Sequence, residues 1–339
     1  MALRKRIQMA LVAAVFLLAT SLGVAQQPAA TNPLQSAPLT QAMPFDSHIA
    51  LGRLPNGLRY YVRANNRPEK RAELRLVVKA GSILEDDDQQ GLAHFVEHMA
   101  FNGTQHFPKQ DVLSFLQSLG MRFGADINAY TSFDETVFIL QVPTDKSDTM
   151  DRSLLILEDW AHNVSFDPVE IDKERGVVME EWRLRRGAGA RMLDKVFPIL
   201  LKGSRYADRL PIGKTEVIQG FKPDRLKQFY ADWYRPDLMA VVAVGDFDRT
   251  AVENLIKAHF GSIPAPRAPR ARTTYDVPDH FGTVYAITTD KEMTTTTVEV
   301  ENLLPARAQG TIGVYRQKIV DRLFSSMLSA RLAERAQLP

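Results

Sequence analysis

The sequence lacks several features that would narrow its function at once. It has no cysteine among 339 residues, which excludes disulfide bridges, thiolate metal sites, a cysteine nucleophile and a lipidated N-terminal cysteine. Neither sign of charge is in excess, because 42 basic and 40 acidic side chains nearly balance, so the basic footprint of a nucleic-acid-binding or membrane-surface protein is missing. With 45% hydrophobic residues, the chain is still long enough for two domains with packed cores.

Long hydrophobic runs are missing too, apart from one near the N-terminus. Residues 10–20 are apolar; three basic residues precede them and small residues follow. This layout predicts a secretory signal peptide over residues 1–25. The alternative, an uncleaved membrane anchor, is disfavoured because the run is short for a spanning helix. We therefore expect a protein secreted across the inner membrane, in the bacterial periplasm, without a stable membrane span after cleavage.

Composition divides the rest of the chain into a leader and two domains. Residues 26–43 are rich in Pro, Ala, Gln and Thr and predict a flexible leader. Residues 44–265 form the expected main domain, and the Pro/Arg/Ala stretch 263–272 reads as a linker. Residues 275–339 offer only two strands and a helix, which is little for an independent domain. We expect this piece to be the start of a second, incomplete domain.

Apolar periodicity and turn residues predict the secondary structure. The expected strands are 58–62, 73–79, 127–131, 136–142, 240–244, 283–288 and 294–300. The expected helices are 90–101, 109–119, 154–164, 168–186, 226–233 and 316–335. The first two strands are expected to pair as a hairpin. The acidic residues 85–88 are expected to form a solvated turn, since they lack the alternating oxygen spacing of a calcium loop.

The stretch HFVEHMAFNGT, which begins at His94, places three polar side chains in an apolar run. On an α-helix, His94 and His98 lie one turn apart, and Glu97 projects beside them into the same wedge of roughly 100°. Two imidazoles so arranged can share a zinc ion, and the adjacent carboxylate can accept a proton from a water that the metal activates. A structural role for each histidine is the alternative, but the H-x-x-E-H order is the inverted zincin signature.

A third ligand is expected, because catalytic zinc usually takes three protein ligands and a water. Without cysteine, it must be His, Asp or Glu. The helix 168–186 is the best source, and its start is well signalled. Asp167 can be the N-cap, Pro168 takes the first helical position, and Glu170 completes a capping box.

Within that helix, two glutamates share a stripe with two valines. Glu174, Val177, Val178 and Glu181 follow the i, i+3, i+4, i+7 spacing of one helical face. A buried carboxylate needs a cation, a metal or hydrogen-bond donors. Glu180 lies about 100° away around the axis and is expected in solvent. The geometry selects Glu181 and Glu174 as ligand candidates, and pairing of both with Arg or Lys stays open as the alternative.

Two further histidines lie near these motifs. His106 lies in a loop after the expected helix 90–101, and His162 lies in the expected helix 154–164. Neither spacing places its ring on the wedge of the His-Glu-His motif. We interpret both as structural residues.

Taken together, the motifs resemble one family. The sequence is similar to the pitrilysin/insulysin family of zinc peptidases, which includes the mitochondrial processing peptidase, from about residue 45 to its end. The matching segments are HFVEH, MAFNGT and FP within residues 94–108, GADINAYT at 124–131 and ERGVVMEE at 174–181. The set is far more specific than the H-x-x-E-H pentapeptide alone.

The resemblance implies a fold and a catalytic site. The fold would be α+β, with a mixed sheet packed by helices. His94 and His98 would bind one zinc ion per chain, and Glu97 would be the general base. Glu181 would be the third ligand, and Glu174 would support the site from behind the ligands. This assignment agrees with the helical-stripe argument.

The resemblance also implies how substrate is held. Asn128, Ala129, Tyr130 and Thr131 match the family's edge strand, which pairs with the backbone of an extended peptide. Two features depart from the pattern. The spacer between His98 and the third ligand is somewhat longer than in the best-known members. The second half of the family's closed chamber, which supplies an Arg and a Tyr to the substrate, is absent.

These inferences lead to two expectations for function. The first is a zinc metallo-endopeptidase that hydrolyses peptides or unfolded polypeptide segments through a zinc-activated water. The second is a non-catalytic or partner-dependent peptide-binding subunit, which needs a second homologous half or subunit. The intact set of His94, Glu97, His98 and Glu181 favours the enzyme, whereas the missing half favours the partner-dependent subunit.

Overall fold

A computed structural model describes residues 37–146 and 148–337 of the chain. The expected signal peptide and the first part of the expected leader lie outside these residues. The described chain forms two units. One is Asp46–Leu303, and the other joins the residues up to Phe45 to those from Leu304 onward.

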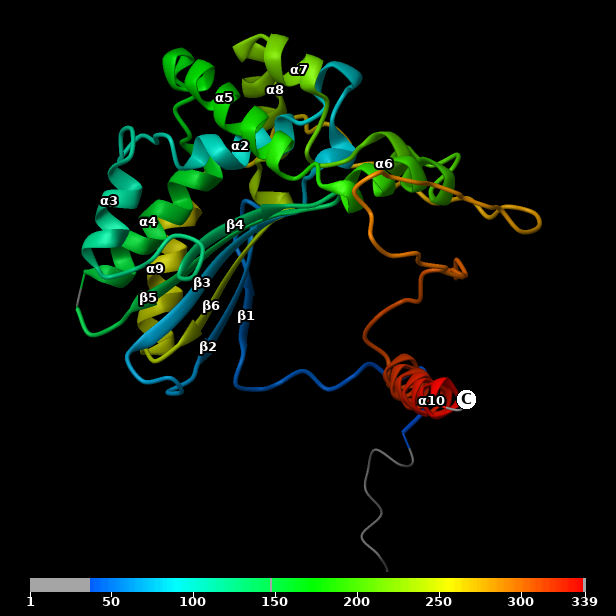
Figure 1. The fold of residues 1–339 in the computed structure, drawn as a ribbon. Helices are drawn as coiled ribbons and strands as arrows, with labels where there is room; N and C mark the ends of the chain where they lie inside the picture. The colour runs from blue at the N-terminus through cyan, green and yellow to red at the C-terminus, as the bar shows by residue number, and fades with distance from the viewer. Residues whose placement is uncertain (1–36, 147, 338–339) are drawn as a thin grey trace, which may run out of the picture. The chain divides into compact units, whose positions relative to one another are not determined.

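The larger unit is built on a six-stranded mixed sheet (Figure 1). Its strands are β1 (Ala50–Arg53), β2 (Arg59–Ala64), β3 (Arg71–Val78), β4 (Ile127–Thr131), β5 (Thr136–Pro143) and β6 (Met239–Gly245). They lie in the order β1-β2-β6-β3-β5-β4, so β4 is an edge strand. Only the β2–β6 pair is parallel, and all other pairs are antiparallel. The α+β fold with a mixed sheet is therefore confirmed.

Helices surround this sheet. The α-helices are α2 (Leu92–Ala100), α3 (Asp111–Ser118), α4 (Thr149–His162), α5 (Pro168–Leu184), α6 (Ala188–Leu200), α7 (Thr215–Gly220), α8 (Pro223–Trp233), α9 (Arg249–Gly261) and α10 (Ile312–Ala336). Short 3-10 helices occupy Ser82–Leu84, Asp87–Gln89, Arg205–Asp208 and Pro236–Leu238. Helices α4 and α9 pack together against the sheet, whereas α2 contacts β4, β5, α5 and α8 (Figure 1). Helix α2 therefore lies between the edge of the sheet and the helix α5.

The strand sequences explain which face the helices cover. In β3, Leu74, Leu76 and Val78 are fully buried, whereas the alternate residues are half-buried. Successive side chains of a strand point to opposite faces, so one face of β3 enters the core. The neighbouring β6 shows the same alternation through Val241 and Ala243. The expected strand 240–244 is thus the centre of the sheet.

The expected hairpin of strands 58–62 and 73–79 is wrong. Both strands exist, but β6 lies between them and pairs with each. Its partners are β2 in parallel and β3 in antiparallel orientation. The turn residues between β2 and β3 could not reveal this, because the intervening strand comes from a distant part of the sequence.

The expected strands 283–288 and 294–300 are also wrong. Residues 264–311 form neither helix nor strand in the structure. Ile287 and Val298 are largely exposed. A strand is stabilised by hydrogen bonds and side-chain contacts to its neighbours, and the described residues provide no neighbouring strand here.

The smaller unit contains α10 and the described end of the leader. Backbone hydrogen bonds join Leu39 and Gln41 to Gly313 and Ile312, at the first turn of α10. The apolar side chains of α10 are mostly exposed. No helix within the part of the chain that the structure describes is long and apolar enough to cross a membrane.

The acidic residues 85–88 differ from the expected solvated turn, because Glu85 is fully buried. Its Oε1 atom accepts hydrogen bonds from Gly91 N and Ala93 N, at 3.0 and 2.8 Å. These amides belong to the start of α2, where Gly91 has a φ of +102° and offers no capping side chain. Glu85 therefore satisfies donors at a buried helix N-terminus. Burial raises the pKa of Glu85 to about 8.

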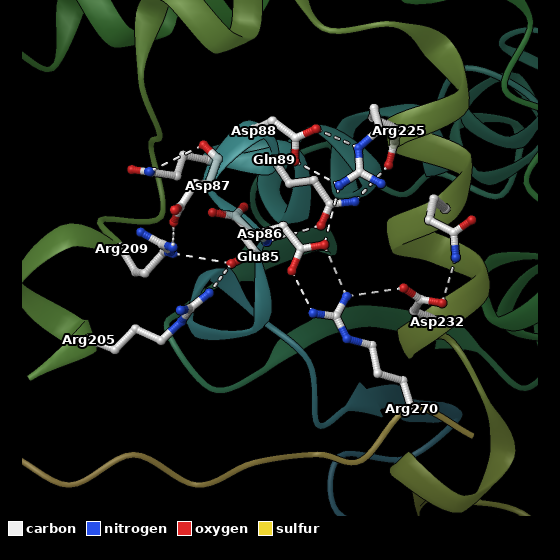
Figure 2. A network of polar contacts seen from close by, with 12 residues as sticks. Glu85, Asp86, Asp87, Asp88, Gln89, Arg205, Arg209, Arg225, Asp232 and Arg270 are labelled. Atoms are coloured by element: carbon white, nitrogen blue, oxygen red, sulfur yellow. Dashed lines mark hydrogen bonds and ion pairs between the residues drawn. The ribbon is translucent and has the colours of Figure 1, made fainter. Parts of the chain in front are cut away.

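Arginines from three other segments contact the acidic turn, as Figure 2 shows. Asp86 lies 2.5 Å from Arg270, and Asp88 lies 2.7 Å from Arg225. Arg209 pairs with Asp87 and also donates to the backbone carbonyl of Glu85. The acidic turn is thus held by cations and by the start of α2. It joins the start of α2 to three other segments of the chain.

Candidate metal centre

Helix α2 presents the His-Glu-His motif to a cleft. His94, Glu97 and His98 all line this cleft, which has a volume of about 510 Å³. All other residues of α2 are buried, so the helix is fixed on every remaining side. Its start is tightly packed, because Gly213 approaches Gly91 so closely that a Cβ on Gly213 would lie 2.3 Å from the Cα of Gly91. The motif therefore lies on a rigid element.

The two imidazoles and Glu181 converge on one point. His94 Nε2 and His98 Nε2 lie 3.2 Å apart, and the ring centroids 4.6 Å apart. The Oε2 atom of Glu181 lies 3.2 Å from His98 Nε2 and 3.7 Å from His94 Nε2. All three ligand atoms lie within 4.8 Å of one another. One cation can contact them together.

Helix α5 supplies both glutamates of the expected stripe. It begins at Asp167, whose Oδ1 accepts from Val169 N at 2.8 Å, as the capping signal predicts. The other half of the expected capping box does not form, since Glu170 accepts from Lys173 instead. The expectation for Glu180 is confirmed, because it is exposed and pairs with Arg183.

The stripe differs from the expectation at one valine. Val178 is fully buried, but Val177 is 52% exposed and lines the cleft between Glu174 and Glu181. The helix turns Val177 toward the cleft because both glutamates, three and four residues away, must face α2. The apolar middle of the stripe is thus divided between the core and the cleft.

Each ligand candidate except His94 has a further partner. His98 Nδ1 donates to Glu174 Oε1 at 2.7 Å, which leaves Nε2 directed at the convergence point. The Oε1 atom of Glu181 lies 2.6 Å from Arg185 Nη2 in an ion pair, and its Oε2 atom lies beside the histidines. Glu181 thus contacts both histidines and an arginine.

Two of these contacts escaped the sequence reasoning. Asn102 donates to Glu174 Oε2 at 2.6 Å, and Arg185 pairs with Glu181. Arg185 lies four residues after Glu181, so the i, i+4 relation was a signal for that pair. Asn102 and Glu174 are 72 residues apart, and local sequence gave no signal for their contact.

Glu97 lies beside the edge strand β4. The Oγ1 atom of Thr131 donates to Glu97 Oε2 at 2.5 Å. Thr131 belongs to the expected substrate-binding edge strand, and the structure also places its side chain against Glu97. Asn128, Ala129 and Tyr130 line the same cleft, and Tyr130 is substantially exposed and hydrogen-bonded to Glu135.

Burial and neighbouring charges shift the pKa values within the cluster. Burial lowers the pKa of His94 to about 4. Burial also opposes the charged form of His98, but hydrogen bonds to Glu174 and Glu181 prevail and raise its pKa to about 9. The hydrogen bond from His98 holds the pKa of Glu181 at about 2. The raised pKa keeps a second proton on the ring of His98. Binding of a cation at His98 Nε2 would displace this proton, so metal binding is linked to proton release.

Burial raises the pKa of Glu97, although the hydrogen bond from Thr131 acts against this. A carboxylate with a raised pKa is a stronger base than a free glutamate. Its position beside the convergence point suits proton transfer.

The two other histidines considered above, His106 and His162, lie outside the cluster. His106 Nδ1 lies 2.7 Å from Asp159 Oδ1, and Asp159 is fully buried. His162 is an exposed residue at the end of α4. Neither lines the cleft.

Comparison with known proteins adds an independent observation. Residues 60–186 match "Insulinase (Peptidase family M16)", and residues 220–338 match "Peptidase M16 inactive domain". The chain belongs to peptidase family M16. The resemblance to the pitrilysin/insulysin peptidases is therefore confirmed, and the α+β fold is the one shared by M16 structures.

Similar M16 proteins carry zinc protease names. The chain is 41% identical over 282 residues to "Zinc protease PQQL-like" of Arabidopsis thaliana, covering 83% of this chain and 30% of the relative. It is 36% identical over 295 residues to "Probable zinc protease PqqL" of Haemophilus influenzae, covering 86% of this chain and 32% of the relative. The chain thus spans about a third of the length of these curated relatives. At the level of the family, they associate it with zinc proteases.

A solved structure gives the same result. The first half of the periplasmic protease PqqL from Escherichia coli superimposes with a TM-score of 0.66 at 39% identity. The match covers 69% of this chain and 50% of that one. An M16 fold and a periplasmic relative are therefore both established for this chain.

Proposed function

We propose that the chain carries the catalytic site of a zinc metallo-endopeptidase that hydrolyses peptides or unfolded polypeptide segments. One observation carries the proposal: His94, His98 and Glu181 converge within 4.8 Å in the cleft that Glu97 also lines. The zinc protease names of similar M16 proteins support it.

The donor set fits a single zinc ion. Two neutral imidazole nitrogens and one carboxylate oxygen are the three protein ligands of many catalytic zinc sites, with a fourth position left for water. Glu174 fixes the ring of His98, and Arg185 holds the other oxygen of Glu181. Such outer partners orient ligands and set the tautomer of a ligating histidine.

The chain's own residues would carry out the proton transfers. When bound, the zinc ion supplies activation of water and polarisation of the scissile carbonyl. Glu97 lines the same cleft, and Thr131 holds its Oε2 atom. Glu97 accepts the proton of the attacking water and then donates it to the leaving amine. The buried setting of Glu97 keeps its basicity high.

The edge strand suggests how a peptide is held. Among the strands in the described part of the chain, β4 pairs with β5 alone, and Asn128, Ala129 and Tyr130 line the cleft next to Glu97. An extended peptide can add to such an edge through its main chain, so side-chain selectivity would be modest. This accounts for our proposal of peptides and unfolded segments as substrates.

The test is a quenched fluorescent peptide incubated with pure protein, with and without a chelator. We expect chelator-sensitive cleavage. The variant Glu97→Gln should keep its zinc but lose about 100- to 10,000-fold in kcat, the usual contribution of a general base. If Glu97→Gln retained its zinc and cleaved the peptide as fast as the parent protein, Glu97 would not be the general base.

A second candidate is a peptide-binding subunit that cleaves only with a partner. The chain spans about a third of the length of its curated relatives, which favours this reading. We propose that residues 44–265 form the zinc peptidase domain and that 275–339 belong to a second domain of the same type. Cleavage that appears only when a homologous half is added would support the partner-dependent candidate.

We further propose export to the periplasm. The signal-like residues 1–25 and the periplasmic relative support it. N-terminal sequencing of the protein from a periplasmic extract should start after Ala25. A mature protein that retains residues 1–25 would contradict this.

A further inference from the structure

Asn102 lies immediately beyond α2, in the MAFNGT segment that carries no assigned role. Its Nδ2 atom donates to Glu174 Oε2 at 2.6 Å and approaches the carbonyl oxygen of His98 at 3.4 Å. Both neighbours are acceptors, so the amide nitrogen, and not the oxygen, must face them. The contact is therefore a defined donation to Glu174.

The two oxygens of Glu174 serve different partners. Oε1 accepts from His98 Nδ1 at 2.7 Å, and Oε2 accepts from Asn102. Glu174 is only 9% exposed, so each oxygen needs a donor within the protein. Two donors on opposite oxygens fix the rotation of the carboxylate. The fixed carboxylate then fixes the ring of His98.

We propose that Asn102 is a positioning residue of the metal centre, which acts on His98 through Glu174 and increases the affinity for zinc. The proposal rests on the zinc-binding part of the proposed function. Without the amide of Asn102, Oε2 of Glu174 would lose its donor, and the carboxylate could turn away from His98 Nδ1. His98 would then lose the fixed ring orientation that directs Nε2 toward His94 and Glu181.

A matched arrangement elsewhere in the chain provides the control. Asp159 is a buried carboxylate that contacts His106 Nδ1 at 2.7 Å and accepts from Asn163 Nδ2 at 3.1 Å. The residue types match the series Asn102, Glu174 and His98, but here both donors share Oδ1, and Thr104 Oγ1 and His106 N donate to Oδ2. His106, Asp159 and Asn163 do not line the cleft. The variant Asn163→Leu therefore removes an asparagine donor from a buried carboxylate outside the metal centre.

The experiment measures zinc affinity by competition with a chromophoric chelator. Asn102→Leu should weaken zinc binding about 10- to 100-fold, the usual range for outer partners of ligands. Asn102→Ala should weaken it less, because Asn102 lines the cleft and water can take its place beside Glu174. Asn163→Leu should leave it within about two-fold, since its carboxylate contacts no proposed ligand. Far-ultraviolet circular dichroism checks that each variant is folded.

The outcomes separate this proposal from the peptidase activity. Zinc affinity that is equal in the parent protein, Asn102→Leu and Asn102→Ala overturns the role of Asn102. An equal loss in Asn163→Leu also overturns it, because the effect would then be general destabilisation. A parent protein without zinc affinity overturns both proposals. Tight zinc binding without peptide cleavage contradicts only the peptidase activity.

Discussion

Two polar clusters lie along helix α2, and they are satisfied in different ways. At its start, Glu85 accepts from backbone amides, and arginines pair with the aspartates that follow (Figure 2). Further along the helix, His94 and His98 turn their Nε2 atoms toward each other and toward Glu181. The carboxylates of the first cluster are paired with the protein's own donors, whereas the ligand atoms of the second converge on a point that suits a cation.

The difference shows that acidity alone does not identify a metal site. The acidic turn has four consecutive carboxylates, yet a guanidinium group or a backbone amide contacts each of them. The metal centre has fewer charges, but two imidazole acceptors and a carboxylate oxygen face one another within 4.8 Å. Convergence of ligand atoms, supported from behind by Glu174, is what distinguishes it.

The largest expected effect removes the convergence itself. Glu181→Ala should lower zinc affinity more than about 100-fold, beyond the range for outer partners, because a ligand is lost. Glu180→Ala, on the neighbouring exposed position, is the control and should change little. Chelator competition measures both. Equal zinc affinity in Glu181→Ala and Glu180→Ala would show that Glu181 is not a zinc ligand.

The next effect concerns the pH dependence of the acidic turn. The pKa of Glu85 rises from 4.5 to about 8 on folding, so the folded state binds the proton more tightly than the unfolded state. Its contribution to stability is full below pH 4.5 and is lost as pH rises toward 8. The side chain of Glu85→Gln does not titrate. The free energy of unfolding of this variant should therefore rise by about 2–4 kcal/mol relative to the parent between pH 5 and 8.

Urea unfolding of both proteins across this pH range measures that difference. It should grow with pH and level off above pH 8. A difference that grows as the pH falls would mean that the carboxylate is stabilised in its charged form.

A smaller effect is expected at Arg209, whose side chain is 4% exposed and pairs with the 91% exposed side chain of Asp87. Arg209→Met should lower the free energy of unfolding by about 1–3 kcal/mol, because the carbonyl of Glu85 loses a buried donor. Zinc affinity should remain within about two-fold of the parent. A large loss of zinc affinity in folded Arg209→Met would show that the two clusters are coupled through α2.

The smallest effect is expected at Asp88. Its pair with Arg225 lies at the surface, and such pairs contribute roughly 0–1 kcal/mol. Asp88→Asn should change the unfolding free energy by less than about 1 kcal/mol, and neither zinc affinity nor cleavage should move. A loss of several kcal/mol in urea unfolding would show that Asp88 acts as part of the buried network.

Much of the candidate site could be predicted from local sequence. The periodicity of α2 and α5 gives the wedge of His94, Glu97 and His98 and places Glu174 and Glu181 on one side of α5. Helical geometry is local, so a short stretch of sequence determines it. The resemblance to M16 peptidases then relates the two helices to each other.

Contacts between distant segments could not be predicted in this way. The separation of β2 and β3 by β6 depends on a strand far along the chain. The burial of Glu85 depends on arginines and backbone amides that lie outside the acidic residues 85–88. The role of Thr131 beside Glu97 likewise depends on how β4 meets α2.

The most direct test is a crystal structure of the zinc-loaded protein with anomalous data at the zinc edge. The account predicts one peak within about 2.0–2.2 Å of His94 Nε2, His98 Nε2 and Glu181 Oε2 at the same time. A zinc-loaded structure without that peak, or with Glu181 turned into bulk solvent, would contradict it.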